Sequence, residues 1–228
     1  MGKTIYNPLQ LRELFHLEFL RWFSRKTKTN SYVLKGGSNL RFFFNSFRYS
    51  EDMDLDAQGI DVHILKGMVM NILVQQSFQD ILKPFGVDRI VGPNINAAKQ
   101  TETTQRFKVH LITFAGEDLF TKIEFSRRGF KGKAVVQSVS NHILRTYKLP
   151  PLLVSHYNAY SAAAQKIGAL SDRTLIQARD IFDLYILSSQ CEPSMAKETD
   201  INNIKLTRAH KNIFEVSFEQ FKDTVVTY

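Results

Sequence analysis

Three aspartates alternate with apolar residues in the segment "EDMDLDA", at positions 52, 54 and 56. Because side chains on a β-strand point alternately to its two faces, Asp52, Asp54 and Asp56 would share one face. Carboxylates placed this close repel each other, and a hard divalent cation held between them relieves the repulsion. Oxygen ligands of this kind suit Mg²⁺ or Mn²⁺. The alternative is a strand whose acidic side faces water, and the short Asp-x-Asp pattern taken alone favours it.

A glycine-rich turn precedes the acidic segment, in "VLKGGS". A short β-rich run leads into Gly36 and Gly37, which have no Cβ and therefore let backbone N–H groups approach a phosphate. The hydroxyl of Ser38 can add a further donor. Taken alone, Gly-Gly-Ser is more often an ordinary tight turn, and it does not match the P-loop pattern. Followed by the acidic pair, it indicates a triphosphate cradle beside a metal site.

A later segment, "LFTKIEFS", offers one more carboxylate. Strand alternation puts Phe120, Lys122 and Glu124 on one face of this segment. If this strand lies near the acidic one, Glu124 can complete the metal shell or orient a nucleophile. An exposed face with alternating Lys and Glu explains the pattern about as well, so the residues alone leave both interpretations open.

The elements that must position these residues begin with helices and strands in the first part of the chain. Asn7 and Pro8 predict the start of a helix over residues 8–26, and Asp61 predicts the cap of a long helix to about residue 83. Three extended runs follow, and a fourth is expected after them. These runs cover residues 87–92, 106–114, 119–126 and 133–139.

A change of pattern at Pro150 and Pro151 indicates a boundary. Beyond it, residues 154–170 and 174–189 have helical patterns, and a polar stretch over residues 190–203 leads into weaker helices. We therefore expect an α/β (α+β) domain over residues 1–148 and an α-helical domain over residues 149–228. Two units of this size would pack together with a cleft between them.

The net charge of +8 favours polyanionic partners such as nucleic acid, nucleotides or an anionic membrane surface. A protein that is simply basic is the alternative.

The single cysteine, Cys191, excludes an intramolecular disulfide and a cysteine-based zinc site, which fits a reducing cytoplasm. No segment reaches the roughly 18 apolar residues of a membrane span, so we expect a cytoplasmic protein without a membrane partner. The histidines show no metal-site spacing, and His110 and His156 are expected to be structural.

A basic loop at residues 126–133, "SRRGFKGK", surrounds Phe130 with four cations. Such a loop can follow phosphates and stack a base, as RNA-binding surfaces do. Loops rich in lysine are usually just solvated, and this is the alternative. The cations of the loop are Arg127, Arg128, Lys131 and Lys133, and Arg145, Lys148, Lys205, Arg208 and Lys211 could extend the track.

Five motifs in this order resemble the AbiEii/AbiGii toxin family of the nucleotidyltransferase superfamily. They are "LKGGSNLR", "YSEDMDLD", "TKIEFSRR", "AQKIGAL" and "ARDIFDLYIL", and together they span about residues 8–190. The resemblance implies a nucleotidyltransferase fold, a small mixed sheet flanked by helices. It also implies a toxin of a two-gene toxin–antitoxin system that defends bacteria against phage, with a cognate antitoxin as a partner. Some members of the family transfer nucleotides to RNA, including tRNA ends.

The resemblance also implies roles for individual residues. Asp52 and Asp54 would bind the metal ions, Lys166 would reach from the helical half towards the phosphates, and Asp180 would be a second essential acid. Asp183 lies one helical turn further on, and a cap or an ion pair is at least as good an interpretation for it. The residues expected to bind the nucleoside triphosphate are Lys35, Gly36, Gly37, Ser38, Arg41 and Lys122.

The resulting hypothesis is a Mg²⁺-dependent transfer of a nucleoside monophosphate (NMP) from a nucleoside triphosphate (NTP) to an acceptor, with release of pyrophosphate. Asp52, Asp54, Lys166 and Asp180 would be the catalytic residues, and Glu124 would join the metal ligands. Two alternatives stay open, one a non-catalytic protein and the other an enzyme with a different acceptor. A degenerate transferase fold could act through partner binding alone, or the acceptor could be a hydroxyl of a protein or of a small molecule.

Overall fold

The computed structural model of the 228-residue chain describes residues 5–94, 99–191 and 202–225. Within these ranges the strands form one seven-stranded mixed sheet in the order β3-β4-β5-β2-β1-β7-β6. Neighbours β2 and β5, and neighbours β1 and β7, run parallel, and the other pairs are antiparallel. The predicted α/β fold class is therefore confirmed. The strands are β1 (Tyr32–Lys35), β2 (Met53–Ala57), β3 (Val87–Val91), β4 (Thr104–Thr113), β5 (Asp118–Ser126), β6 (Ala134–Ser138) and β7 (Leu153–Tyr157).

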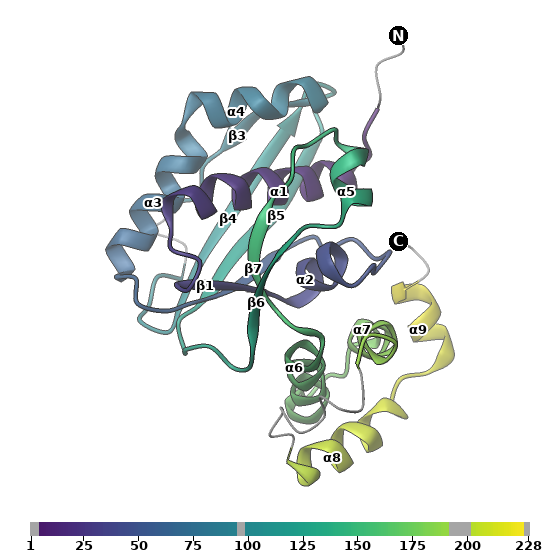
Figure 1. Cartoon of the computed structure of the whole chain (residues 1–228). Helices are drawn as coiled ribbons and strands as arrows, with labels where there is room; N and C mark the ends of the chain where they lie inside the picture. The colour runs from purple at the N-terminus through teal and green to yellow at the C-terminus, as the bar shows by residue number, and fades with distance from the viewer. Residues whose placement is uncertain (1–4, 95–98, 192–201, 226–228) are drawn as a thin grey trace.

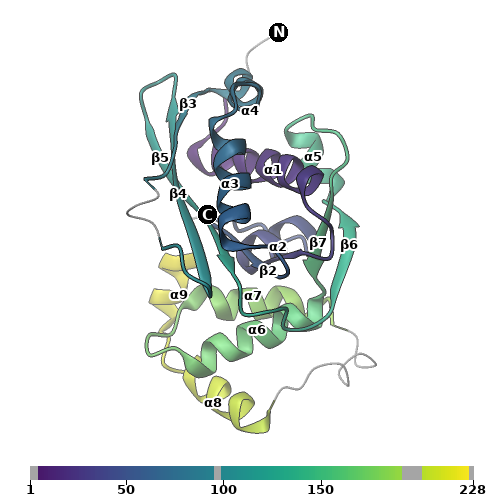
Figure 2. The same ribbon diagram turned by 90° about the vertical axis from the view of Figure 1, so that its left-hand side faces the viewer.

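The helices fall into two groups. Helices α1, α3 and α4 lie together on one side of β4 and β5 (Figure 2), and helices α6 to α9 gather at the end of the molecule below the sheet (Figure 1). Helix α2 lies between the two groups, and it contacts both the sheet and α7. The helices are α1 (Pro8–Lys26), α2 (Gly36–Phe43), α3 (Val62–Val74), α4 (Gln76–Leu82), α5 (Asn141–Thr146), α6 (Ala159–Asp172), α7 (Ala178–Ser188), α8 (Asn203–Ile213) and α9 (Phe218–Val225).

The main hydrophobic core lies between the sheet and helices α1, α3 and α4. Met53 and Leu55 of β2, Phe107 of β4 and Ile123 of β5 are fully buried there. Because side chains alternate along each strand, the polar residues between them, Asp54 among them, point to the opposite face of the sheet. The alternation read from the sequence thus separates a core face from a polar face.

The predicted bounds of the first helix, residues 8–26, are confirmed. Asn7 and Gln10 form a reciprocal capping box, with each side chain bonded to the other's backbone at 2.9 Å, and Pro8 occupies the first turn. On the apolar stripe of α1, Phe15 and Phe19 are fully buried in the core, and Trp22 packs against it partly buried.

The single long helix predicted after Asp61 is wrong, because the structure divides it into α3 and α4. Asp61 caps α3 as predicted, but Gln75 is extended with ψ 122°, and α4 starts at Gln76. Continuation of the apolar face of α3 would have brought Gln76 and Asp80 towards the core. The break brings Phe78 there instead, where its ring packs edge-on against the rings of Phe15 and Trp22.

The helix predicted from residue 154 is wrong in its first four residues, which belong to strand β7. This strand lies between β1 and β6, and Val154 and Tyr157 are fully buried. Helix α6 then starts at Ala159, because the Asn158 side chain accepts a hydrogen bond from the Ser161 backbone at 2.9 Å. The sheet therefore continues past the paired prolines, and the division of the chain at residue 148 stays a prediction.

His156 accordingly lies on a strand and not on a helix, but it is structural as expected. It is fully buried, and its ring nitrogens contact the Asn39 side chain at 2.9 Å and the Gln137 side chain at 3.0 Å. Burial lowers the pKa of His156 to about 4, so the ring is neutral at neutral pH.

The last helices follow the predicted order. Most of the polar stretch over residues 190–203 lies outside the described residues, and α8 and α9 come after it. Across the described ranges, none of the helices has the length and apolar character needed to cross a membrane.

Candidate active site

A cavity of about 840 Å³ lies between the polar end of the sheet and the helices α6 and α7. Its walls come from the junction of β1 and α2, from β2, from the basic loop at residues 126–133, and from α6, α7 and α8. Among the described residues that line it, nine are Lys or Arg and six are Asp or Glu. The size suits a ligand such as a nucleotide, and the excess of cations favours an anionic one.

The three alternating aspartates all line this cavity, and they therefore share one face, as the strand pattern predicted. Asp56 is buried and accepts hydrogen bonds from Tyr157 Oη at 2.6 Å and from Lys35 Nζ at 2.5 Å. Asp52 pairs with Lys122 at 3.0 Å. In the part of the chain that the structure describes, the Asp54 carboxylate accepts no hydrogen bond. Asp56 is thus an anchor of the sheet, whereas Asp54 is a carboxylate with unused acceptor capacity.

The surroundings of Asp54 raise the pKa of its carboxyl group. Burial is the largest cause, and the neighbouring charges of Glu124 and Asp52 add to it, against the opposing effects of Lys122 and Lys35. A divalent cation would relieve this cost, because it favours the ionised form. Asp52 and Asp54 therefore have the donor chemistry that a Mg²⁺ or Mn²⁺ site requires.

The two glycines do not form the turn that the sequence predicted, since they begin helix α2. Gly36 has a left-handed φ of +68°, and a Cβ placed on it would lie 3.0 Å from Asp54 Oδ2. None of the described side chains caps this helix N-terminus, which lies at the cavity wall. An uncapped N-terminus offers free N–H groups and a partial positive charge to an anion. The predicted phosphate-binding N–H groups are therefore those at the start of a helix, and not those of a tight turn.

The backbone before Asp54 is fixed by hydroxyl groups. Ser38 Oγ and Ser50 Oγ both donate to the Asp52 carbonyl oxygen, at 3.1 Å and 2.7 Å. One residue earlier, Thr121 Oγ1 donates to the Glu51 carbonyl at 2.7 Å. These bonds hold the entry to β2 in place on both sides, and with it the direction of the Asp52 side chain.

This packing leaves little room for a side chain at Gly37. A Cβ at residue 37 would lie 2.8 Å from Ser50 Oγ and 3.1 Å from Arg48 Nη2. We expect Gly37→Ala to lower the free energy of unfolding by about 1–3 kcal/mol, because the added atom overpacks the site. Urea denaturation measures this change. Gly67→Ala is the matched control, since no described residue lies within 4 Å of a Cβ at that position in α3, and it should stabilise the chain by roughly 0.5–1 kcal/mol. Equal effects of the two substitutions would contradict the packing argument.

Ser38 and Arg41, both expected at the nucleotide, do not line the cavity. The Ser38 hydroxyl is buried on the Asp52 carbonyl. Arg41 pairs with Glu13 of α1 at 2.6 Å and lies over the Tyr49 ring at 4.3 Å. In this arrangement their side chains position the α2 region, while Lys35, Gly36, Gly37 and Lys122 do line the cavity.

Glu124 lies next to Asp54 in the parallel pairing of β2 and β5. Its carboxylate, however, pairs with Arg106 at 2.7 Å and does not line the cavity. Within the described ranges, no group of three or more His, Cys, Asp or Glu side chains could hold a metal ion. A Mg²⁺ ion commonly has only one or two protein carboxylates and completes its shell with waters and substrate phosphates, so the pair Asp52 and Asp54 still fits.

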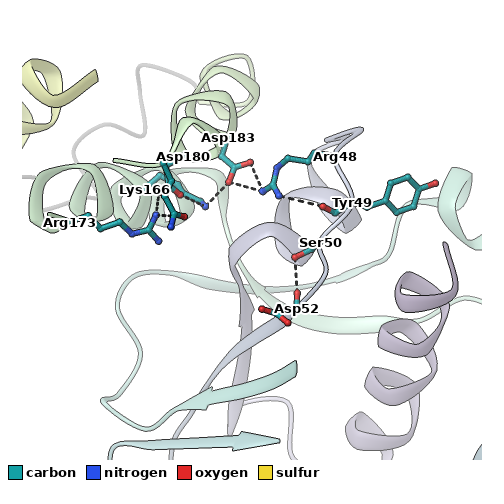
Figure 3. Close-up of polar contacts among 9 residues, drawn as sticks. Arg48, Tyr49, Ser50, Asp52, Lys166, Arg173, Asp180 and Asp183 are labelled. Carbon is teal, nitrogen blue, oxygen red and sulfur yellow. Dashed lines mark hydrogen bonds and ion pairs between the residues drawn. The ribbon is translucent and has the colours of Figure 1, made fainter. Parts of the chain in front are cut away.

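Lys166 of α6 lines the helical side of the cavity, and the two aspartates of α7 hold its side chain (Figure 3). Its Nζ is 2.9 Å from Asp180 Oδ1 and 2.6 Å from Asp183 Oδ2, and both aspartates are almost completely buried. Arg173 also pairs with Asp180, and Arg48 pairs with Asp183 at 3.0 Å. Three cations around two carboxylates leave a net positive charge at this wall.

The family model for the nucleotidyl transferase AbiEii toxin of type IV toxin–antitoxin systems matches residues 18–226. The chain belongs to this family. No curated protein matches it.

Three solved structures are similar to this AbiEii-family chain in fold. MenT4, a nucleotidyltransferase toxin from Mycobacterium tuberculosis H37Rv, has a TM-score of 0.61 and 14% identity, and the match covers 96% of this chain and 88% of that one. JHP933 from Helicobacter pylori has a TM-score of 0.55 and 17% identity, over 99% and 100% of the two chains. An antigenic nucleotidyltransferase-like protein from Paracoccidioides brasiliensis has a TM-score of 0.51 and 14% identity, over 90% and 88%. At these identities the similarity establishes the nucleotidyltransferase fold.

The basic loop of this AbiEii-family chain lies at the same cavity. Arg128 and Lys131 line its wall, and the Lys131 backbone donates to Tyr157 Oη at 2.9 Å. Arg127 turns away, because it donates to the Glu102 carbonyl at 3.2 Å. Lys205 of α8 is the one member of the wider predicted track that lines the cavity in the described part of the chain.

Arg48, Arg173 and Arg179 are cavity residues that sequence reasoning did not select. Arg179 and Arg173 flank the start of α7, so their nearness to Asp180 in the sequence was a usable signal. Arg48 offered none, because its partner Asp183 lies 135 positions away.

Proposed function

We propose that this AbiEii-family protein transfers an NMP from an NTP to an acceptor and releases pyrophosphate. The observation that supports this most directly is the position of the Asp54 carboxylate against Gly36, at the uncapped start of α2. An anion-binding helix end and a carboxylate pair suited to a divalent cation thus meet within one cavity.

We assign the metal ligands to Asp52 and Asp54, and the place of Glu124 as a third ligand stays a prediction. When bound, Mg²⁺ would neutralise charge on the attacking and leaving oxygens of the transfer. The side chains of the cavity would bind and orient the triphosphate. Lys122 is already at the Asp52 carboxylate, 3.0 Å away, where it can offset phosphate charge.

Lys166 is proposed to meet the triphosphate from the opposite wall. Its ammonium group is fixed between Asp180 and Asp183, so it presents its charge without having to be ordered on binding. In this assignment Asp180 and Asp183 both act by positioning Lys166, and Asp183 additionally binds Arg48.

RNA, including tRNA, is proposed as the acceptor. Arg128 and Lys131 border the cavity on the side of the basic loop, which suits a phosphate backbone leading to the reacting group. The family assignment further supports a toxin role, with an antitoxin as the partner that restrains it, and phage defence is proposed as the setting of this role.

A screen of α-labelled NTPs against total RNA, protein and small-molecule acceptors tests this function. We expect label to enter RNA, and EDTA to abolish the transfer because the carboxylate pair needs its cation. Added Mg²⁺ or Mn²⁺ should restore it. Transfer that persists in EDTA would contradict the metal assignment, label in protein or in a small molecule would replace the RNA acceptor, and no transfer of any NTP would overturn the function.

A further inference from the structure

The polar face of the sheet continues from the acidic strand onto β5, β4 and β3. The Cα pairing of these strands aligns Val91, His110 and Phe120 in one row across them. Residues paired in this way point to the same face. Phe120 is 64% exposed and Val91 is 44% exposed, so the row is an apolar and aromatic strip on the surface. In Figure 2, α1 and α3 lie on the other side of these strands.

The strip is held in a fixed arrangement. The rings of His110 and Phe120 stack with their centroids 4.4 Å apart and their planes at 17°. His110 Nε2 contacts Asp118 Oδ1 at 2.7 Å, and the Phe120 carbonyl accepts a hydrogen bond from Arg12 of α1 at 2.9 Å. The Phe120 ring packs against His110, and its backbone is bonded to Arg12. The ring therefore loses little conformational freedom when a ligand stacks on it.

Cations separate this strip from the carboxylate pair. Lys108 and Lys122 are Cα partners in the next row, and Lys122 contacts Asp52. Lys108 is exposed, and among the described residues it has no ion-pair partner. From Phe120 to Lys122 is two strand positions, roughly 7 Å. The order along the face is therefore aromatic platform, cations, carboxylate pair.

We propose that this strip binds a base next to the reacting end of a single-stranded RNA acceptor. A base would stack on Phe120, and Lys108 would contact the neighbouring phosphate. Aromatic side chains on a sheet surface with cations beside them bind single strands in this way, and every base has a face that can stack. We choose RNA as the ligand because Lys108 and Lys122, which lie between the strip and the carboxylate pair, are positively charged and suit a polyanion. This inference rests on the proposed function for its direction towards Asp52.

Equilibrium binding of a 5′-fluorescein-labelled single-stranded RNA dodecamer, followed by anisotropy, tests the strip. The measurements use protein with Asp54→Asn, so that no turnover occurs. We expect Phe120→Ala in this background to weaken binding about 5- to 100-fold, and Phe120→Trp to retain it. Phe218→Ala is the matched control, since Phe218 on α9 is 79% exposed, and it should leave binding unchanged. Lys108→Ala should reduce the slope of log K against log salt concentration by about 0.7.

Two results would overturn the strip: equal dodecamer affinity with Phe120 and with Ala at this position, or no dodecamer binding at low salt. The transfer assay with the wild type separates this from the proposed function. Transfer to RNA with an affinity independent of Phe120 removes the strip and leaves the function. Binding that depends on Phe120 without any NMP transfer removes the function and leaves the strip as an RNA-binding surface.

Discussion

Asp54→Asn is expected to remove NMP transfer while making the folded chain more stable. Loss of a metal ligand costs several kcal/mol of barrier, which corresponds to a fall of about a thousandfold or more in rate. The fold should gain stability because burial disfavours the charge of Asp54, and no described residue donates a hydrogen bond to its carboxylate. Transfer of label from the NTP and thermal unfolding of the same preparation measure the two effects.

The sign of the stability change follows from the pKa. Burial raises the pKa of Asp54 in the folded state, so the folded chain binds this proton more tightly than the unfolded chain does. Above that raised pKa the ionised group destabilises the fold, and the penalty disappears as the pH falls through it. Asn carries no charge at any pH, so the gain from Asp54→Asn should be present at neutral pH and shrink in acid.

Asp56→Asn is the matched control on the same face of the same strand. Asp56 accepts bonds from Lys35 and Tyr157, so its replacement should lower the stability. Mg²⁺ should raise the unfolding temperature of the wild type and leave that of Asp54→Asn unchanged, because a ligand stabilises only the state that binds it. Full transfer by Asp54→Asn, or a fall in its stability at neutral pH, would refute the role given to this carboxylate.

Patterns of short range predicted the fold class and the common face of the three aspartates. The alternation in "EDMDLDA" correctly put Asp52, Asp54 and Asp56 together at one cavity, because the period of a strand is a local property of the backbone. The capping signals at Asn7 and Asp61 worked for the same reason. Strand β7 was missed because its residues lead directly into α6, so periodicity assigned them to the helix.

Side-chain partners across the fold could not be read in this way. Ser38 and Arg41 stand in the expected motif, yet neighbouring elements bind their polar groups, the Asp52 carbonyl in one case and Glu13 in the other. Glu124 has the expected neighbour, Asp54, but its carboxylate binds Arg106 on the next strand. A pattern assigns a residue to a face, and the pairing of elements then decides which groups on that face remain available to a ligand.

Asp183→Ala is expected to lower the free energy of unfolding by about 3–5 kcal/mol. The Asp183 carboxylate is completely buried, and it accepts from Arg48 Nη2 at 3.0 Å and lies 2.6 Å from Lys166 Nζ. Lys166 keeps Asp180 as a partner after the substitution, but Arg48 is left buried without this carboxylate. The bond joins the segment before β2 to α7, so the loss should appear as a large shift of the denaturation midpoint.

A double variant separates the cost of a broken pair from the value of the pair itself. Arg48→Met with Asp183→Leu replaces two charges with apolar groups of similar size, and it should recover most of the lost stability. Asp80→Ala in the exposed pair with Lys83 is the control, and it should leave the free energy of unfolding nearly unchanged. If Asp183→Ala changes the free energy of unfolding as little as Asp80→Ala does, the pair of Arg48 and Asp183 does not stabilise the packing of α7. If the double variant is as unstable as Asp183→Ala, the charge of Arg48 is not what makes the single substitution costly.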